Sequence, residues 1–537
     1  MKNILLFISV IFFFSFANAQ SPTIGLLYHD TNVSDGYVLF SPLINNEVFL
    51  INTCGEKVHQ WAFNEAPGAT CYLLNNGNLL RAGKNNLEIR DWNNNIVWTY
   101  ATTANGIQQH HDITPLPNGN ILCIVSDFYT ATQMTAAGKN PTSTTANTKL
   151  EKIIEIQPIG TNSAAVVWEW KFFNHLVQDF DATKSNYGVV ENHPELLDPN
   201  FNYGNVTDYV HSNGIDYNPI LDQILISSRH LSEIFIIDHS TTTAQAAGHT
   251  GGNLNKGGDF LWRWGNPQVY RHGTEADRKL FMQHNPMWVE NDYLDTGKIS
   301  VFNNGAPNSA QIFSTVVLLT PEISNGNYTM TNSIFNPSSY DWSWGGDILG
   351  VTLNQERQSG TQAMPNGNMI ISEAITGRVS EMTKTGTLLW SYKNPTGPIV
   401  SNLTTYYNQF DIPTSNSFFK AEKYPNTFIG FVGHDLTPLA ILEDVNTISS
   451  NCSTLGIPYF SYLDNIKVQN PSKNNLIQFN SNSFFNKISI YDLKGRLIFE
   501  QENFSDNHIN INLKQSIYLL KIEKESYTKT MKLIVQD

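Results

Sequence analysis

Apolar residues along this chain occur in short runs of strand length, each bounded by a turn signal. The runs LL at 79–80, ILCIV at 121–125 and MII at 369–371 each follow an Asn-Gly pair. Asn-Gly accepts positive φ at both central turn positions, so it closes a tight hairpin between two strands. Further runs follow, such as LEIR at 87–90 and IVWTY at 96–100. No stretch beyond the N-terminal leader shows a long 3.6-residue apolar period. The pattern predicts an all-β protein.

A tryptophan followed two residues later by a second aromatic ring recurs six times. The pairs are Trp61/Phe63, Trp98/Tyr100, Trp168/Trp170, Trp262/Trp264, Trp342/Trp344 and Trp390/Tyr392, and they hold nine of the eleven tryptophans. This spacing places both rings on one face of a strand, where they can pack against a neighbouring sheet. Successive pairs are separated by about one propeller blade of ~40 residues or by more, which leaves room for inserted loops. We therefore expect a six-bladed β-propeller; the alternative is a β-sandwich with scattered core tryptophans.

The N-terminus has the pattern of a secretory signal peptide. Lys2 precedes an apolar run at residues 4–16, and Ala17 and Ala19 form a small-residue cleavage site before Gln20. The run is too short to span a bilayer, and no later segment approaches the ~20 apolar residues needed. We expect an exported, soluble protein without a transmembrane segment. The formal charge of −14 argues against a nucleic-acid partner, because phosphate binding needs a basic surface.

Four cysteines fall in the expected mature chain, namely Cys54, Cys71, Cys123 and Cys452. An even number outside the cytoplasm permits two disulfides in any of three connectivities, and buried free thiols are the equal alternative. The cysteines show no CxxC spacing and no histidine-rich partner cluster, so a zinc site is not expected. We predict no metal and no other cofactor.

The last seventy-odd residues differ in charge from the rest of the chain. From residue 465 onward there are ten Lys and Arg against seven Asp and Glu, whereas the remainder is strongly acidic. Strand-like runs at 488–491, 497–499, 517–522 and 530–535, with a Lys494-Gly495 turn, predict a small C-terminal β-sandwich. The predicted organisation is a signal peptide at 1–19, the propeller at 20–450, a linker at 451–464 and the sandwich at 465–537.

The order NP at 470–471, IYDLKGR at 490–496, IYLL at 517–520 and KLIV at 532–535 resembles the C-terminal sorting domain of the type IX secretion system. The resemblance implies a Bacteroidetes-type cell, recognition by the type IX machinery, passage through the outer membrane, and release or surface attachment. A plain accessory β-domain is the alternative.

Propeller function usually lies at one mouth of the central channel, where the innermost strands begin. Three such strand starts carry a histidine, in HHD at 110–112, HSNGIDY at 211–217 and QHN at 283–285. We expect His111, His211 and His284 to converge on the axis, joined by Arg229 from the strand that follows His211. Each histidine could instead be an ordinary hydrogen-bonded residue, and Arg229 a structural ion-pair partner.

Converging imidazoles with an arginine suit an anion that carries several oxygens. Neutral imidazole is a competent nucleophile near pH 7, and Arg and His can hold sulfuryl or phosphoryl oxygens. No P-loop is present, so a nucleotide sulfate donor is not indicated. Residues 171–210 lack strand alternation and are expected to cap a channel mouth. Their rings, Phe172, Phe173, Tyr187, Tyr203 and Tyr209, would stack on an aromatic substrate or, alternatively, pack on the outer edge of the blades.

Several segments resemble the bacterial arylsulfate sulfotransferase family over roughly residues 35 to 445. They are NHLVQDFD at 174–181, HPEL at 193–196, HSNGIDY at 211–217, LDQILISSRH at 221–230, EIFIIDHS at 233–240, WGNP at 264–267, FMQH at 281–284 and FNNG at 302–305. The resemblance implies a six-bladed propeller that moves a sulfuryl group from a phenolic sulfate to a phenol through a sulfohistidine. The expected catalytic residues are His111, His211, His284 and Arg229, and the expected substrate-binding residues are Asn213, His230, Asn304 and Tyr209.

Two departures from the family pattern leave a second reading open. After FNNG the family commonly has an arginine, whereas here Ala306, Pro307 and Asn308 follow, and the next basic residue is Arg357. The sixth inner strand begins at Ser359 without the family's late channel histidine, and His434 is the only later candidate before the tail. The alternative function is a surface-displayed propeller that binds its ligand without turnover.

Overall fold

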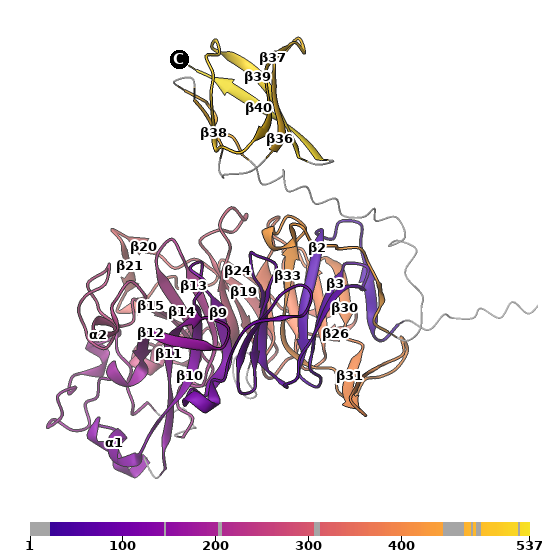
Figure 1. Ribbon diagram of the computed structural model, residues 1–537. Coiled ribbons are helices and arrows are strands. Elements are labelled where there is room, and N and C mark those ends of the chain that lie inside the picture. The colour runs from indigo at the N-terminus through magenta and orange to yellow at the C-terminus, as the bar shows by residue number, and fades with distance from the viewer. Residues whose placement is uncertain are drawn as a thin grey trace, which may run out of the picture.

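The computed structural model describes residues 22–143, 146–201, 207–305, 312–443, 467–473, 476–479, 485–524 and 527–536. The described chain is built almost wholly of antiparallel sheets, with two short α-helices, α1 (Ala131–Ala136) and α2 (Thr243–Ala246), in connections between strands (Figure 1). The all-β prediction is confirmed. Among the described residues, no helix is long and apolar enough to cross a bilayer.

Six sheets of four or five strands make up the part of the described chain before residue 444. With the strands of each sheet given in their hydrogen-bonded order, the first sheet is β33 (Phe418–Pro425), β2 (Gly36–Pro42), β3 (Glu47–Asn52), β4 (Glu56–Ala62) and β34 (Ala440–Ile441), and the second is β5 (Pro67–Leu73), β6 (Leu79–Gly83), β7 (Leu87–Arg90) and β8 (Ile96–Tyr100). The third sheet is β9 (Gln109–Pro115), β10 (Ile121–Tyr129), β11 (Thr148–Ile159) and β12 (Ser163–Lys171), and the fourth is β13 (Ser212–Asn218), β14 (Gln223–Ser228), β15 (Glu233–Asp238) and β16 (Trp262–Trp264). The fifth sheet is β17 (His284–Trp288), β18 (Ile299–Asn303), β19 (Thr315–Leu319) and β24 (Trp342–Trp344), and the sixth is β27 (Gly360–Ala363), β28 (Met369–Glu373), β29 (Arg378–Met382), β30 (Leu388–Lys393) and β1 (Gly25–His29).

Small hairpins decorate these sheets. They are β20 (Ile323–Ser324) with β21 (Asn327–Tyr328), β22 (Met330–Thr331) with β23 (Ile334–Phe335), β25 (Asp347–Ile348) with β26 (Val351–Thr352), and β31 (Thr396–Val400) with β32 (Leu403–Tyr406). In Figure 1, β20 and β21 lie at one side of the row of sheets and β31 at the other.

The first strands of the six sheets contact one another in a cyclic order. Strand β5 contacts β9, β9 contacts β13, β13 contacts β17, β17 contacts β27, β27 contacts β33, and β33 contacts β5. Both ends of this region also share sheets, because β1 pairs with β30 and β33 pairs with β2. Distant parts of the chain are therefore held together by backbone hydrogen bonds, which are lost only if whole strands detach.

Each tryptophan pair lies on a different sheet, on its fourth strand, and joins that sheet to the next. The indole N–H donates to a backbone carbonyl in the connection after the third strand of the neighbouring sheet or, for Trp98, at the first residue of its fourth strand. The bonds are Trp61 to Asp91, Trp98 to Ser163, Trp170 to Gly258, Trp262 to Asn336, Trp342 to Lys384 and Trp390 to Thr53. The tryptophan repeat predicted from the sequence thus corresponds to a repeated contact between sheets. A buried indole N–H needs such a partner, which explains why each ring faces a polar connection.

The C-terminal described residues form a separate β unit. Its sheet runs in the order β37 (Leu497–Phe504), β36 (Phe485–Tyr491), β39 (Ser516–Lys524) and β40 (Tyr527–Val535). A second sheet pairs β35 (Leu476–Gln478) with β38 (His508–Asn510). Ile488, Ile490, Leu520 and Ile522 are fully buried between these layers. The four predicted strand runs of this tail are confirmed. The predicted signal peptide and linker lie outside the described residues.

Of the four cysteines, Cys71 and Cys123 are buried free thiols. Burial raises the pKa of the Cys71 thiol to about 12, so this sulfur stays protonated and unreactive. Cys54 is also buried, and Cys452 lies outside the described residues.

Candidate active site

Three predicted histidines lie at or near the beginning of consecutive inner strands. His111 is in β9, His211 immediately precedes β13, and His284 begins β17. The backbone of His111 has φ 55° and that of His211 has φ 52°. A left-handed backbone costs a non-glycine residue of the order of 1–3 kcal/mol, and such strain is concentrated at functional sites. The strained pair therefore marks this end of the inner strands as a candidate site.

His111 and His211 contact each other directly. Their Nε2 atoms are 3.1 Å apart, and His211 Nδ1 lies 2.7 Å from Asp208 Oδ2. The carboxylate can only accept, so the His211 hydrogen is on Nδ1 and its Nε2 carries the lone pair. His111 then supplies the hydrogen between the two rings from its own Nε2. The arrangement leaves His211 Nε2 as an oriented electron-pair donor, with a carboxylate behind the ring.

A ring of polar groups surrounds this pair. His230 Nδ1 donates to the Asp208 carbonyl at 2.5 Å. Lys149 Nζ lies 2.9 Å from Asp208 Oδ1 and 3.5 Å from Glu151 Oε1, and it donates to His110 Nε2 at 3.3 Å. Lys149 and Glu151 are two positions apart on β11, so both side chains point to the same face of the sheet. These contacts hold Asp208 from two sides and fix the position of His211.

The charges of the site favour an anion at neutral pH. Burial and the neighbouring His211 lower the pKa of His111 to about 3, and burial lowers the pKa of His230 to about 4, so both rings are neutral. Burial raises the pKa of Glu151 to about 8, which leaves this carboxyl protonated. Burial opposes ionisation of Asp208, but the hydrogen bonds and charges of His211 and Lys149 together outweigh burial and lower the Asp208 pKa strongly.

Arg229 completes this charge distribution. Its backbone N–H donates to the His211 carbonyl at 3.1 Å, and its positive charge contributes to lowering the pKa values of His111, His230 and His284. With Lys149 and Arg229 positive and Asp208 negative, the site carries a net positive charge.

His284 is close to the same group but is engaged differently. Its Nδ1 donates to Asn304 Oδ1 at 2.8 Å, and the backbone N–H of Gln358 donates to its Nε2 at 3.1 Å. The ring is almost fully buried, and burial holds its pKa well below the usual range. Phe419 lies between the histidines, stacked on His111 at 5.4 Å and edge-on to His284 at 6.2 Å. Both nitrogens of His284 are engaged by the surrounding framework, through Asn304 and the Gln358 backbone, whereas Nε2 of His211 contacts the Nε2 of another histidine, His111.

The predicted substrate-binding residues fall into two groups. His230 belongs to the histidine cluster. Asn304 donates to the carbonyls of Gln355 and Gln358 and accepts from His284, so it positions that ring. Asn213 is buried and donates to the Gln283 carbonyl at 2.8 Å. Tyr209 is buried, with its hydroxyl 2.6 Å from the Asp198 carbonyl. The structure thus places Asn304, Asn213 and Tyr209 within the supporting framework.

In its described residues, 172–201 and 207–211, the segment between β12 and β13 contains two 3-10 turns and isolated bridges. Phe172 joins the hydrophobic core, while Phe173 stacks on Tyr129 at 4.0 Å. Phe173 and Tyr187 line a cavity of about 750 Å³. Tyr203 lies outside the described residues. The predicted capping of a channel mouth stays a prediction, while two of the four described rings, Phe172 and Tyr209, pack in the core.

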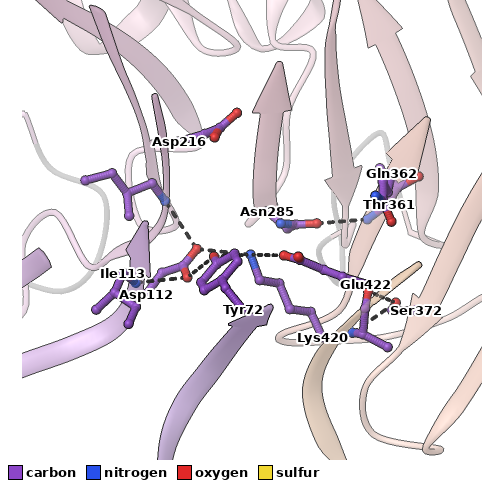
Figure 2. Close-up of polar contacts among 12 residues, drawn as sticks. Tyr72, Asp112, Ile113, Asp216, Asn285, Thr361, Gln362, Ser372, Lys420 and Glu422 are labelled. Atoms are coloured by element: carbon purple, nitrogen blue, oxygen red, sulfur yellow. Dashed lines mark hydrogen bonds and ion pairs between the residues drawn. The ribbon is translucent and has the colours of Figure 1, made fainter. Parts of the chain in front are cut away.

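A buried polar network lies one residue further along the same inner strands (Figure 2). Tyr72 from β5 donates to Asp112 Oδ1 at 2.8 Å, and Lys420 from β33 donates to Tyr72 Oη at 2.8 Å. Lys420 Nζ is also 3.4 Å from Asp112 Oδ2 and 3.5 Å from Glu422 Oε1. Asp112 follows His111, and Lys420 follows Phe419, so the network anchors the backbone that carries both rings.

Sequence reasoning missed Asp208, Lys149, Glu151 and Phe419. The alternation of Lys149 and Glu151 on one strand was a usable signal, and Asp208 lies only three residues before His211. The late candidate His434 stacks on Trp92 at 4.2 Å. Residues 306–308, where the sequence departs from the family pattern that has an arginine, lie outside the described residues.

Three groups of side chains in the described chain are close enough to hold a metal ion. They are His110, His111 and His211; Asp208, His211 and His230; and His175, His249 and Asp259. The spacing of residues along the chain gave no sign of these groups, because each group is assembled from separate segments.

Two family profiles match the chain. The Arylsulfotransferase (ASST) profile matches residues 60–326, and the Secretion system C-terminal sorting domain profile matches residues 470–536. The chain therefore contains an arylsulfotransferase-family region followed by a sorting domain of the type IX secretion system, as the sequence resemblances predicted. No curated protein gives a significant match.

Similar solved structures include a protein of unknown function from Bacteroides caccae, with 14% identity, a TM-score of 0.38 and coverage of 67% of this chain and 94% of that one. Virginiamycin B lyase from Staphylococcus aureus is 10% identical, with a TM-score of 0.30 and coverage of 69% and 87%. AztD from Citrobacter koseri is 6% identical, with a TM-score of 0.32 and coverage of 73% and 99%.

Proposed function

We propose that this protein is an exported aryl-sulfate sulfotransferase that carries the sulfuryl group on His211. The observation that carries the proposal is the chain of contacts from Asp208 through His211 to His111, within a region that matches the arylsulfotransferase family. The substrates are small phenolic sulfates and phenols. The sorting domain supports export and recognition by the type IX machinery, with release or surface attachment as the end point.

The proposed scaffold is a six-bladed propeller spanning residues 20–450, followed by a linker at 451–464 and the sorting sandwich at 465–537. Support comes from six sheets, cyclic contacts between their first strands, and one tryptophan bond from each sheet to the next. Equivalent strand starts ring the axis of such a scaffold, which would bring His111, His211 and His284 together.

In the first half-reaction, His211 Nε2 attacks the sulfur of the aryl sulfate. An N–S bond forms, the S–O bond to the aryl oxygen breaks, and the phenolate leaves with the electron pair. The ring of His211 becomes positive, and Asp208, 2.7 Å from Nδ1, stabilises that charge. As the sulfate binds, the Nε2–H of His111 moves its hydrogen bond from His211 Nε2 to a sulfuryl oxygen, which frees the lone pair of His211 for attack. This N–H and the guanidinium of Arg229 then hold the sulfuryl oxygens, which gain negative charge in the transition state.

In the second half-reaction, an acceptor phenolate attacks the sulfur, the N–S bond breaks, and its electron pair returns to His211 Nε2. Phenolates are stable enough to leave and enter without a strong general acid, so solvent exchanges the proton between the two phenols. In this proposal His284 remains neutral and acts through its contacts with Asn304 and Gln358.

Turnover of a chromogenic aryl sulfate, with and without an added phenol, tests the proposal. We expect phenol-dependent release of the chromophore from the parent and a loss of at least about 10³-fold in His211→Ala. Mass spectrometry at alkaline pH should find one sulfuryl group on the peptide that contains His211. The control His193→Ala replaces a more exposed histidine outside the cluster and should retain the parent rate.

Two results would contradict the proposal. Parent turnover that survives His211→Ala in a folded variant would place the chemistry elsewhere. Tight binding of the aryl sulfate without chromophore release by the parent would establish the alternative, a propeller that binds its ligand without turnover.

A further inference from the structure

A second histidine cluster lies outside the proposed active site. His175 follows the 3-10 turn Phe172–Asn174, and His249 and Asp259 belong to the connection between α2 and β16. Asp259 Oδ1 is 2.9 Å from His175 Nδ1 and 2.7 Å from His249 Nδ1. Two imidazole nitrogens and one carboxylate oxygen therefore converge on a single point, from segments more than seventy residues apart.

The hydrogen bonds of His175 leave Nδ1 without a hydrogen in the neutral ring. Its Nε2 is 2.9 Å from the Ala246 carbonyl, which can only accept, so the ring hydrogen is on Nε2. Nδ1 then points its lone pair at Asp259 Oδ1, an arrangement that repels unless a cation lies between them. A proton that makes His175 an imidazolium would satisfy it, and so would a metal ion. The Nε2–H bond to a backbone carbonyl is the usual support behind a metal-binding histidine.

Two of the three ligands are held rigidly. His175 is fully buried and stacks on Trp170 with ring centroids 5.4 Å apart and planes 7° apart. Trp170 in turn donates to the Gly258 carbonyl at 2.7 Å, next to Asp259. A Cβ on Gly258 would lie 2.6 Å from His175 Nε2, so glycine is needed for this approach. His249 differs, because 59% of its side chain is exposed. The open side of the cluster therefore faces solvent.

We propose that His175, His249 and Asp259 bind a divalent zinc ion, with water completing the coordination. Two imidazoles and a carboxylate suit zinc. Bonds of about 2.1 Å in a tetrahedron place ligand atoms about 3.4 Å apart, so the separations of 2.9 and 2.7 Å need to widen by about 0.5 and 0.7 Å. The ion joins the segment after β12 to the connection before β16. His249 also lines the 750 Å³ cavity, so zinc fixes one wall of that cavity.

Zinc content and affinity of the purified full mature chain test the site. Elemental analysis and a chelator-competition titration with zinc should give one equivalent for the parent. His249→Ala should weaken zinc binding by at least about 100-fold, because it removes a direct ligand. Because this position is exposed, the variant should fold like the parent, and circular dichroism checks the fold. The matched control His193→Ala lines the same cavity without contributing to the cluster and should keep the parent affinity.

A further variant separates this site from the histidines of the proposed active site. His211→Ala should still bind one zinc ion, and cobalt in place of zinc should give the same visible ligand-field spectrum in parent and His211→Ala but not in His249→Ala. No zinc binding by the parent, binding unchanged in His249→Ala, or binding lost in His211→Ala would each overturn the proposal. The first of these results would identify the cluster as an imidazolium–carboxylate pair.

Discussion

The indole N–H of Trp390 donates to the backbone carbonyl of Thr53 at 2.6 Å, although the two residues are 337 positions apart in the chain. Trp390 lies on β30 in the last of the six sheets, and Thr53 lies in the turn between β3 and β4 in the first. Both groups are buried. This bond repeats, at the junction of the last and first sheets, the contact that every other tryptophan pair makes with its following sheet.

Loss of this bond should destabilise the region formed by the six sheets. Trp390→Phe keeps an aromatic ring but leaves the buried Thr53 carbonyl without its donor, which costs about 1–3 kcal/mol. Thermal unfolding should therefore begin a few degrees lower than in the parent. The control Trp344→Phe changes a half-buried ring of the preceding sheet and should have a smaller effect. Equal unfolding temperatures in parent and Trp390→Phe would show that this junction contributes little.

Asp208 should act on turnover through His211. Asp208→Asn replaces the accepting carboxylate with an amide and removes the charge that stabilises the positive ring, so we expect kcat to fall by about 10³-fold. The KM for the aryl sulfate should change much less, because Asp208 does not face the substrate in the proposed arrangement. Steady-state kinetics separates the two effects. A raised KM with unchanged kcat would instead assign Asp208 to substrate binding.

Glu151 should make activity decline in mild alkali. Its pKa of about 8 means that the carboxyl is neutral at pH 7 and gains a negative charge above pH 8, next to Lys149. That charge opposes the binding of an anionic sulfate, so kcat/KM should fall as the pH rises through 8. Glu151→Gln keeps the neutral shape and should remove this alkaline decline. A pH–rate profile with the same decline in both proteins would attribute it to another group.

Glu151 should also affect stability with a defined sign. Its folded-state pKa lies above the ordinary value of 4.5, so the folded protein binds more protons than the unfolded chain between pH 4.5 and 8. The contribution of Glu151 to the free energy of unfolding therefore decreases as the pH rises through this window. Chemical denaturation of parent and Glu151→Gln at pH 5 and pH 8 measures it. Relative to the parent, Glu151→Gln should therefore have a higher free energy of unfolding at pH 8 than at pH 5.

The network around Lys420 should be necessary for folding. Lys420→Met leaves Asp112 and Glu422 buried without their cation, and breaking a buried ion pair from one side costs about 3–5 kcal/mol. Reduced soluble yield and a lower unfolding temperature are expected. Lys184→Met, at a partly exposed surface pair with Asp181, is the control and should unfold like the parent. An unfolding temperature unchanged by Lys420→Met would mean that the network carries no net stability.

The sequence by itself determined the local elements of this protein. Alternating apolar runs and Asn-Gly turns predicted strands that the structure contains, because strand and hairpin formation depends on neighbouring residues. The spacing of Trp262 and Trp264 placed two rings on one strand face, and the same reasoning identified the other pairs. His111 and His211 were identifiable because they lie at or just before the start of recognisable strands.

Only the tertiary structure decided what these side chains contact. Asp208 contacts Nδ1 of His211, whereas Asn304 and the Gln358 backbone contact the two nitrogens of His284, so two histidines at similar strand positions have different surroundings. His175 and His249 likewise meet only because two separate connections are packed together. Such differences depend on contacts between segments distant in the chain, and no periodicity within a single strand encodes them.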